Sequence, residues 1–182
     1  MRRTLMPLAL LLVPTLAILG CKYGGTAGSM SGDMPPPFGG QEDMEHAADL
    51  WGRMVSYQGW ASYPGLGGFQ EGKSPHGKYL KYYINSTAAS NPRRPGNGSI
   101  IIKENYGKKS DAALGAITVM EKIRDYDPEN GDWFWVKFAP DGTVMKNPMG
   151  MSLAGRVAKG MNKGCIACHG NAGGGDYLFI ND

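Results

Sequence analysis

The segment SIIIKENY, residues 99–106, is the clearest indicator of the fold class in this sequence. Three isoleucines and a tyrosine make up half of it, which is typical of a β-strand because β-branched and aromatic side chains fit the pleated backbone. Successive side chains of a strand point to opposite faces of its sheet. One face then carries Ile100, Ile102 and Glu104, and the other carries Ile101, Lys103 and Asn105.

Glu104 is a candidate site residue on this strand. If the Ile100 face lies toward the core, the Glu104 carboxylate points into an apolar space, where desolvation raises its pKa unless a donor or a cation answers it. Ionisable groups in such surroundings are candidates for functional sites, so Glu104 is a candidate proton acceptor. In the alternative interpretation, Glu104 lies at the end of the strand and turns out to water.

Three further segments have a strand-like composition. They are residues 78–85 (KYLKYYIN), 112–123 (AALGAITVMEKI) and 132–138 (DWFWVKF). Pro-Gly, Asn-Gly and Asp-Gly pairs between the segments predict short turns, so consecutive strands should pair antiparallel. Helical spacing predicts a helix over 41–57 that packs on the sheet, and another helix is expected over about 152–161. The predicted fold class is α+β, a mainly antiparallel β-sheet with flanking helices.

The first forty residues differ from the rest of the chain. Residues 1–20 have two arginines and then an apolar run too short for a membrane span, which is the architecture of a secretory signal peptide. Leu-Gly precedes Cys21, as in a bacterial lipoprotein signal, so Cys21 is expected to carry lipid; alternatively, cleavage elsewhere removes Cys21 or leaves it free. Residues 21–40 are rich in Gly, Ser, Pro and Met without a period and should form a flexible tether. Residues 41–182 should form one domain on the periplasmic side of a bacterial membrane, lipid-anchored or secreted.

The charge of the chain gives no reason to expect a nucleic-acid partner. The formal net charge is +3, and Arg2 and Arg3 of the leader supply two of these charges. No basic stripe follows in the rest of the sequence. We therefore expect no nucleic acid to bind.

The motif NKGCIACHG, residues 162–170, could hold a zinc ion, a disulfide or a haem. A structural zinc needs about four nitrogen or sulfur ligands. Apart from Cys165, Cys168 and His169, the chain has only His46, His76 and the cysteine expected to carry lipid. A redox Cys-x-x-Cys usually follows an early strand of an alternating α/β pattern, and that pattern is missing here.

Cys-x-x-Cys-His is the attachment sequence of a c-type haem. The two thiols add to the haem vinyl groups as thioethers, and the histidine lies next to the iron. Export agrees with this cofactor, because the attachment takes place outside the cytoplasm. We expect one covalent haem c per chain, attached at Cys165 and Cys168, with His169 as the ligand of the iron.

The late position of the motif narrows the class of haem protein. In many small c-type cytochromes the motif lies near the N-terminus, and a methionine far downstream binds the iron as its second axial ligand. Here no methionine follows His169. The upstream methionines are more simply core or loop residues. We expect an open, five-coordinate iron that binds small ligands, and His46 and His76 to be surface or structural residues.

Four linked stretches of the chain resemble the cytochrome P-460 family, which includes cytochrome c′-β. They are residues 74–85 (SPHGKYLKYYIN), 98–107 (GSIIIKENYG), 116–142 (AITVMEKIRDYDPENGDWFWVKFAPDG) and 164–179 (GCIACHGNAGGGDYLF). The resemblance covers about residues 51–182. It implies an antiparallel β fold with flanking helices, one c-type haem with five-coordinate iron held by His169, and usually a homodimer.

The family divides by chemistry. Its P-460 members oxidise hydroxylamine with a haem cross-linked to a lysine of the sheet and with a pocket carboxylate, which Glu104 matches. Its c′-β members lack the cross-link and bind nitric oxide in an apolar pocket. The best register places the cross-link position near Leu80. A slip of two residues would make Lys78 the cross-linking residue, whereas Lys81 faces the other way. In the alternative interpretation both lysines are solvated strand residues, which favours the c′-β type.

Three functions follow from these observations. The first is a c′-β-like haem protein that binds nitric oxide or a related small ligand. The second is a P-460-type oxidoreductase that oxidises hydroxylamine and passes electrons to a redox partner cytochrome, with Glu104 as proton acceptor and Lys78 or Lys81 cross-linked to the haem. The third is a simple electron carrier whose sixth ligand is an upstream methionine.

Overall fold

A computed structural model of the chain describes residues 37–181. The predicted signal peptide, Cys21 and most of the predicted tether lie outside the described residues. The helices are α1 (Gln41–Arg53), α2 (Ser86–Ser90) and α3 (Cys165–His169), with 3-10 turns at Tyr57–Gly59, Asp111–Ala113, Pro128–Asn130 and Phe179–Asn181. The strands are β1 (Ala61–Ser62), β2 (Gln70–Glu71), β3 (Tyr79–Ile84), β4 (Ile100–Tyr106), β5 (Leu114–Lys122), β6 (Trp133–Phe138) and β7 (Ala154–Gly155).

The seven strands within residues 37–181 form one antiparallel sheet, which confirms the predicted fold class. The strand order is β1-β3-β4-β5-β6-β7, and β2 also pairs with β3. The four long strands, β3 to β6, are consecutive in the chain and adjacent in the sheet. Each begins and ends within two residues of the segment predicted from composition, because β-branched and aromatic residues alternate there with turn signals between them.

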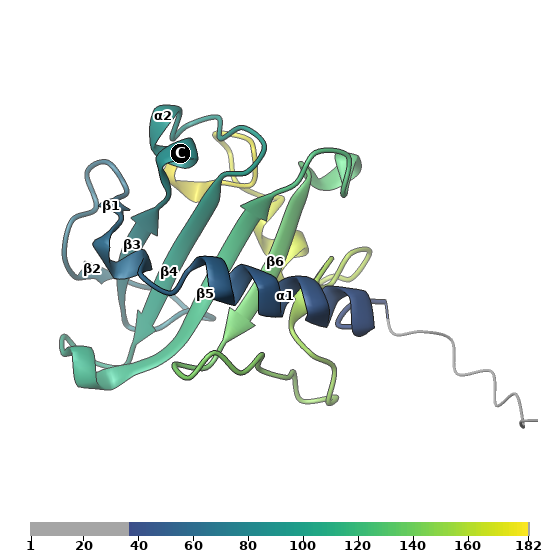
Figure 1. Cartoon of the computed structure of the whole chain (residues 1–182), viewed down its shortest axis with the longest axis horizontal. Helices are drawn as coiled ribbons and strands as arrows, with labels where there is room; N and C mark the ends of the chain where they lie inside the picture. Colours follow the sequence, from purple (N-terminus) through teal and green to yellow (C-terminus); the bar gives the residue numbers. More distant parts are fainter. Residues whose placement is uncertain (1–36, 182) are drawn as a thin grey trace, which may run out of the picture. The chain divides into compact units, whose positions relative to one another are not determined.

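Both faces of the sheet are covered. Helix α1 crosses one face, and the C-terminal part of the chain, drawn in yellow, lies against the other (Figure 1). On the α1 face, Ile100 and Ile102 of β4 pack with Leu50 and Met54 of the helix. We call this the helix face of the sheet.

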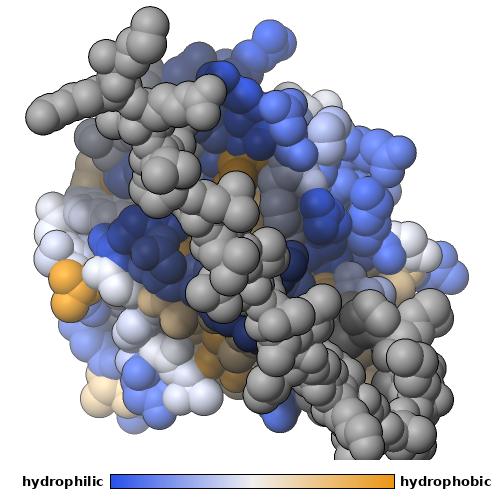
Figure 2. Space-filling view, turned by 45° about the vertical axis from the view of Figure 1, so that its right-hand side comes forward, coloured by the Kyte–Doolittle hydropathy of each residue, from blue (hydrophilic) through white to orange (hydrophobic). Residues whose placement is uncertain are grey.

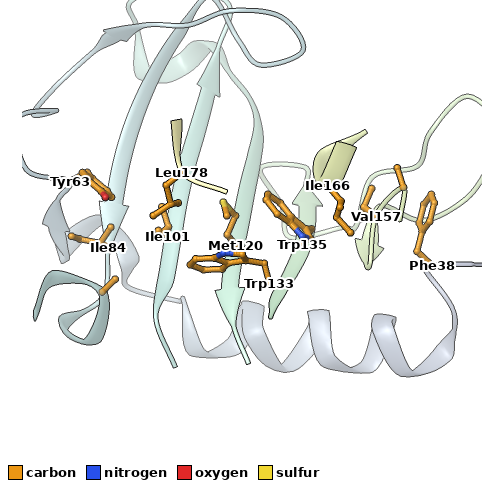
Figure 3. Packing of buried hydrophobic residues seen from close by; sticks show 12 residues of the cluster. Phe38, Tyr63, Ile84, Ile101, Met120, Trp133, Trp135, Val157, Ile166 and Leu178 are labelled. Atoms are coloured by element: carbon orange, nitrogen blue, oxygen red, sulfur yellow. The ribbon is translucent and has the colours of Figure 1, made fainter. Parts of the chain in front are cut away.

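The opposite face, which we call the motif face, carries the second layer of the core. Its buried side chains form a row from Tyr63 at one end to Phe38 at the other, with Trp133 and Trp135 near the middle (Figure 3). Ile166, in the middle of the Cys-x-x-Cys-His segment, belongs to this cluster. The segment is therefore anchored to the sheet by its own apolar residue.

The expected helix over 152–161 was wrong. The chain there forms the short strand β7 and then a series of turns. Gly155 and Ala158 have φ of 93° and 66°, in the left-handed region that a right-handed helix does not use. A Cβ on Gly155 would collide with the Asp43 carboxylate, so the chain can pass α1 this closely only with glycine at this position.

Two other boundaries differ from the sequence-based expectation. Helix α1 ends at Arg53, and residues 57–59 form a separate 3-10 turn. The residues just before α1 were expected in the tether, but Phe38 is 3% exposed and the Gly39 amide donates to Ala154 O at 2.9 Å. The folded domain therefore includes Phe38.

The surface visible in Figure 2 is mostly hydrophilic, with apolar residues scattered among polar ones. Among the described residues, the large apolar side chains that are exposed are Val55, Met149, Met161 and Phe179. Within residues 37–181, no helix is both long enough and apolar enough to cross a membrane.

Candidate haem site

The Cys-x-x-Cys-His segment forms the short helix α3. Residues at positions i, i+3 and i+4 of a helix lie on one side of it, so Cys165, Cys168 and His169 point the same way. The helix follows Gly164, whose φ is 132° and where a Cβ would collide with the side chain of Ala158. Glycine at this position lets α3 start directly against the preceding turn.

Both thiols of the motif are free. Cys165 is partly buried, and burial raises the pKa of its thiol to about 11 although the nearby Lys137 acts in the opposite direction. Cys168 is exposed. Thioether attachment requires two thiols three residues apart, and within residues 37–181 neither thiol is in a disulfide.

His169 has the arrangement of a metal-binding imidazole. It is 9% exposed, and its Nδ1 lies 2.7 Å from Tyr177 O. A carbonyl oxygen only accepts, so Nδ1 carries the proton and Nε2 keeps its lone pair. Burial lowers the pKa of His169 to about 4, which keeps the ring neutral at pH 7. Histidines that bind metals usually donate their other ring N–H to such a partner.

Three rings surround His169. The Trp135 ring centroid lies 4.8 Å from that of His169, the Phe179 centroid 5.3 Å and the His76 centroid 6.3 Å. Trp135 is 3% exposed, and its Nε1 has no hydrogen-bond partner among the described residues. A buried donor without an acceptor is costly. It indicates that a further polar group belongs beside His169, and a haem brings two carboxylates.

Lys103 and Lys137 belong to the site and were missed in the sequence. Lys103 shares the motif face with Ile101; desolvation lowers its pKa to about 8, while the two motif thiols act to raise it. Its Nζ lies 5.4 Å from the centroid of the Tyr82 ring. Strand alternation already placed Lys103 and Glu104 on different faces of the sheet, but only the fold shows which face contacts the motif.

Glu104 lies on the other face of the sheet from His169. It is fully buried, and it accepts hydrogen bonds from Tyr57 Oη at 2.6 Å, Tyr106 Oη at 2.5 Å and Gln58 Nε2 at 3.0 Å. Burial and the bond to Glu104 raise the pKa of both tyrosines. Glu104 does point inward, as the alternation indicated, but into a polar cluster formed by the 3-10 turn Tyr57–Gly59 and Tyr106 of β4.

Of the two lysines singled out in the sequence, Lys78 falls by strand alternation on the motif face and Lys81 on the helix face. Lys78 is exposed just before β3. Lys81 faces away from the motif, as the alternation indicated: its Nζ lies 2.5 Å from Asp111 Oδ1 and 4.5 Å from the Phe69 ring centroid. His46, also on the helix face, binds Glu121 Oε2 at 2.7 Å.

The residues present fit a covalently attached haem. Two thiols, the Nε2 of an imidazole and an indole N–H, all without partners among residues 37–181, lie on one face of the sheet. Within the described part of the chain, no group of three or more His, Cys, Asp or Glu side chains could hold a metal ion. Two hollows, one beside Tyr63 and Arg93 and one beside Trp60 and Ala89, are not lined by the motif residues.

The chain combines an antiparallel sheet with one Cys-x-x-Cys-His helix near the C-terminus, in which an imidazole nitrogen of His169 is available next to the two cysteines. These features define a c-type cytochrome. Residues 58–180 match the family model of Cytochrome P460, and the chain belongs to the cytochrome P460 family. Membership implies a c-type haem, and Cys165 and Cys168 agree with its attachment. A comparison with curated proteins finds no match to the chain.

Proposed function

We propose that the chain is an exported mono-haem protein that binds nitric oxide, or a related small ligand, at its haem iron. The observation that carries this proposal is the position of Glu104, which the sheet separates from His169. The rings nearest His169 are those of Trp135, Phe179 and His76. A neutral diatomic ligand needs no carboxylate beside it, whereas oxidation of hydroxylamine releases protons and is helped by a placed base.

Cys165 and Cys168 would hold the haem and His169 would bind its iron. When bound, the haem supplies an iron that takes up small ligands and changes oxidation state. The protein contributes the neutral imidazole, kept in one orientation by Tyr177 O, and an aromatic surround that excludes water.

The location and partners of the protein belong to the same proposal. A lipid on Cys21 would hold the domain at a membrane on the periplasmic side, where c-type haem is attached. By family resemblance the domain would be a homodimer, and a redox partner cytochrome would set the oxidation state of the iron.

The proposal is tested on the full chain produced with the c-type haem attachment system. We expect one haem per chain that stays bound after denaturation, and a shift of the Soret band when nitric oxide is added to the reduced protein without oxygen. His169→Ala should change the ferrous spectrum. An unchanged spectrum would refute His169 as the ligand, and a failure of nitric oxide to bind would refute the function.

Oxidation of hydroxylamine remains a second candidate because of Lys103. This partly buried lysine lies on the motif face, where its lowered pKa gives it a larger neutral, nucleophilic fraction than an exposed lysine has. If a lysine is cross-linked to the haem, the structure favours Lys103 over Lys78 or Lys81.

Lys103→Met tests this candidate, with Lys81→Met on the helix face as the matched control. A cross-linked haem gives a broad, strongly red-shifted Soret band in the reduced protein. That band should disappear in Lys103→Met alone, together with hydroxylamine oxidation. A wild-type protein without the red shift has no cross-link, and a low-spin spectrum with methionine ligation would indicate the electron carrier instead.

A further inference from the structure

His76 lies next to His169 although the two are far apart in the sequence. The ring centroids are 6.3 Å apart, and the ring planes are nearly perpendicular at 87°. His76 precedes β3, and its ring is held against the motif face of the sheet by Asn105. The sequence suggested a structural residue, but its neighbour is the expected ligand of the iron.

The hydrogen bonds around Asn105 decide which nitrogen of His76 carries a proton. Asn105 Nδ2 donates to Lys103 O at 2.8 Å, Ala116 O at 3.2 Å and Thr118 Oγ1 at 3.2 Å. The amide nitrogen is therefore turned toward these acceptors, and Asn105 Oδ1 faces His76 Nδ1 at 3.0 Å. An amide oxygen only accepts, so His76 Nδ1 holds the proton and Nε2 keeps a lone pair.

His76 thus repeats the arrangement of His169. In each ring Nδ1 donates to an oxygen, and within residues 37–181 Nε2 has no hydrogen-bond partner. This pattern is common in histidines that bind metals, because the bond at Nδ1 orients the ring and makes Nε2 more basic. In His46, the remaining histidine of the chain, Nε2 is by contrast hydrogen-bonded to Glu121.

The separation of the two rings fits a metal ion between them. Two imidazoles that bind one ion from opposite sides, with each metal–nitrogen distance about 2.0–2.1 Å, have ring centroids roughly 6–6.5 Å apart. The centroids of His76 and His169 are 6.3 Å apart. Perpendicular ring planes are compatible with such a pair, because each ring can turn about the axis that joins the nitrogens to the metal.

We propose that His76 is the sixth ligand of the haem iron in the ligand-free protein and that an incoming small ligand displaces it. This rests on the proposed function only in requiring a haem at Cys165 and Cys168 with His169 on its iron. The five-coordinate iron expected from the sequence then exists only while His76 is moved away. His76 acts as a gate, and its departure limits how fast a ligand can bind.

The test begins with the holoprotein itself. We expect the ferric wild type to be low-spin, with the near-infrared magnetic circular dichroism of two histidine ligands. In His76→Ala the iron should become high-spin, while His46→Ala, on the helix face, should keep the wild-type spectrum. A high-spin wild type, or a low-spin spectrum unchanged in His76→Ala, would overturn the proposal.

Ligand kinetics give a second measurement. In the wild type the observed rate of binding should level off at high ligand concentration, because departure of His76 becomes limiting. In His76→Ala the rate should rise linearly with concentration and exceed the wild-type plateau at least tenfold. A wild-type rate that stays linear and equals that of the variant over the same range contradicts the gate.

A further variant covers the case in which His76→Ala loses the haem. His76→Met should keep a low-spin iron and shift the near-infrared bands from those of two histidines to those of histidine and methionine. Bands that do not move would show that His76 is not a ligand. Covalent attachment, measured after denaturation, separates the two proposals: a chain without haem refutes the proposed function, and a haem-loaded high-spin wild type refutes only the gate.

Discussion

At the scale of single residues, Glu104 is a buried carboxyl group whose oxygens are all hydrogen-bonded by neighbouring donors. Its oxygens accept from Tyr57, Tyr106 and Gln58, so three donors of the helix face satisfy the buried carboxyl group. A buried polar group that loses a hydrogen-bond partner is costly, so each of these donors stabilises the folded state. These contacts favour a structural role for Glu104 on the helix face, and its role as a proton acceptor stays a prediction.

Tyr106→Phe tests the role of Glu104. Removing one donor should lower the free energy of unfolding by about 1.5–3 kcal/mol. The haem spectrum and the nitric oxide binding rate should stay as in the wild type, because the change lies on the other face of the sheet. Denaturant unfolding measures the first and absorption spectroscopy the second.

Tyr79→Phe is the control, since the Tyr79 hydroxyl makes no hydrogen bond within residues 37–181, and it should change the stability by less than about 0.5 kcal/mol. If Tyr106→Phe slows ligand binding tenfold or more while the protein stays folded, Glu104 acts on the haem after all.

At the scale of elements, α1 is held to the sheet by a charged group as well as by its apolar side. Glu121 of β5 receives Arg53 Nη1 at 2.7 Å, Arg53 Nη2 at 3.0 Å and His46 Nε2 at 2.7 Å. Burial alone raises the pKa of Glu121, but the hydrogen bonds from His46 and Arg53 outweigh burial and hold it below its usual value. The ionised carboxylate therefore favours the folded state.

Glu121→Gln should lower the free energy of unfolding by about 1–3 kcal/mol at pH 7. A carboxylate whose folded pKa is depressed contributes stability above its unfolded pKa of about 4.3, and this contribution is lost as the pH falls through the folded pKa. The difference between wild type and variant should be constant from pH 7 to about 5 and shrink below about 4. Denaturant unfolding across this range measures it.

Asp49→Asn serves as the comparison, because the exposed Asp49–Arg53 pair is worth less than about 0.5 kcal/mol. A Glu121→Gln difference that does not shrink in acid would mean that the charge of Glu121 is not what holds α1.

At the scale of the whole molecule, the sheet is a central layer with a core on each side. Phe38 lies at one end of the row of buried side chains on the motif face (Figure 3). The next residue, Gly39, joins the start of the domain to β7 by a hydrogen bond from its amide to Ala154 O. The folded domain therefore includes residues whose composition is that of a linker. The apolar area buried by one aromatic ring can offset the chain entropy lost when the neighbouring Gly and Pro residues become ordered.

Phe38→Ala should lower the free energy of unfolding by about 3–5 kcal/mol, the usual result of emptying a buried aromatic site. Val55→Ala, at a side chain that is 89% exposed, should stay within about 0.5 kcal/mol of the wild type. Thermal unfolding of the haem-loaded proteins measures both. Equal melting temperatures for the two variants would place the boundary of the domain after Phe38.

Local sequence patterns predict much of this fold. The four long strands, the first helix and the Cys-x-x-Cys-His segment follow from composition and spacing over a few residues. Residues 152–161 do not, since Gly155 and Ala158 take left-handed conformations that the rest of the domain imposes. The alternation in β4 separated Glu104 from Lys103 correctly, but both faces of that strand are buried, so alternation could not choose the face that meets the motif.

The kind of cofactor and the kind of fold can be predicted from the sequence, because thioether attachment and strand formation depend on residues close together in the chain. Long-range packing, by contrast, sets which side chains gather around His169. His76, Lys103 and Trp135 lie near His169 and come from three separate segments. Glu104 lies on the other face of the sheet. Such neighbours are set by which layers pack on which face, and that depends on the burial of the whole chain at once.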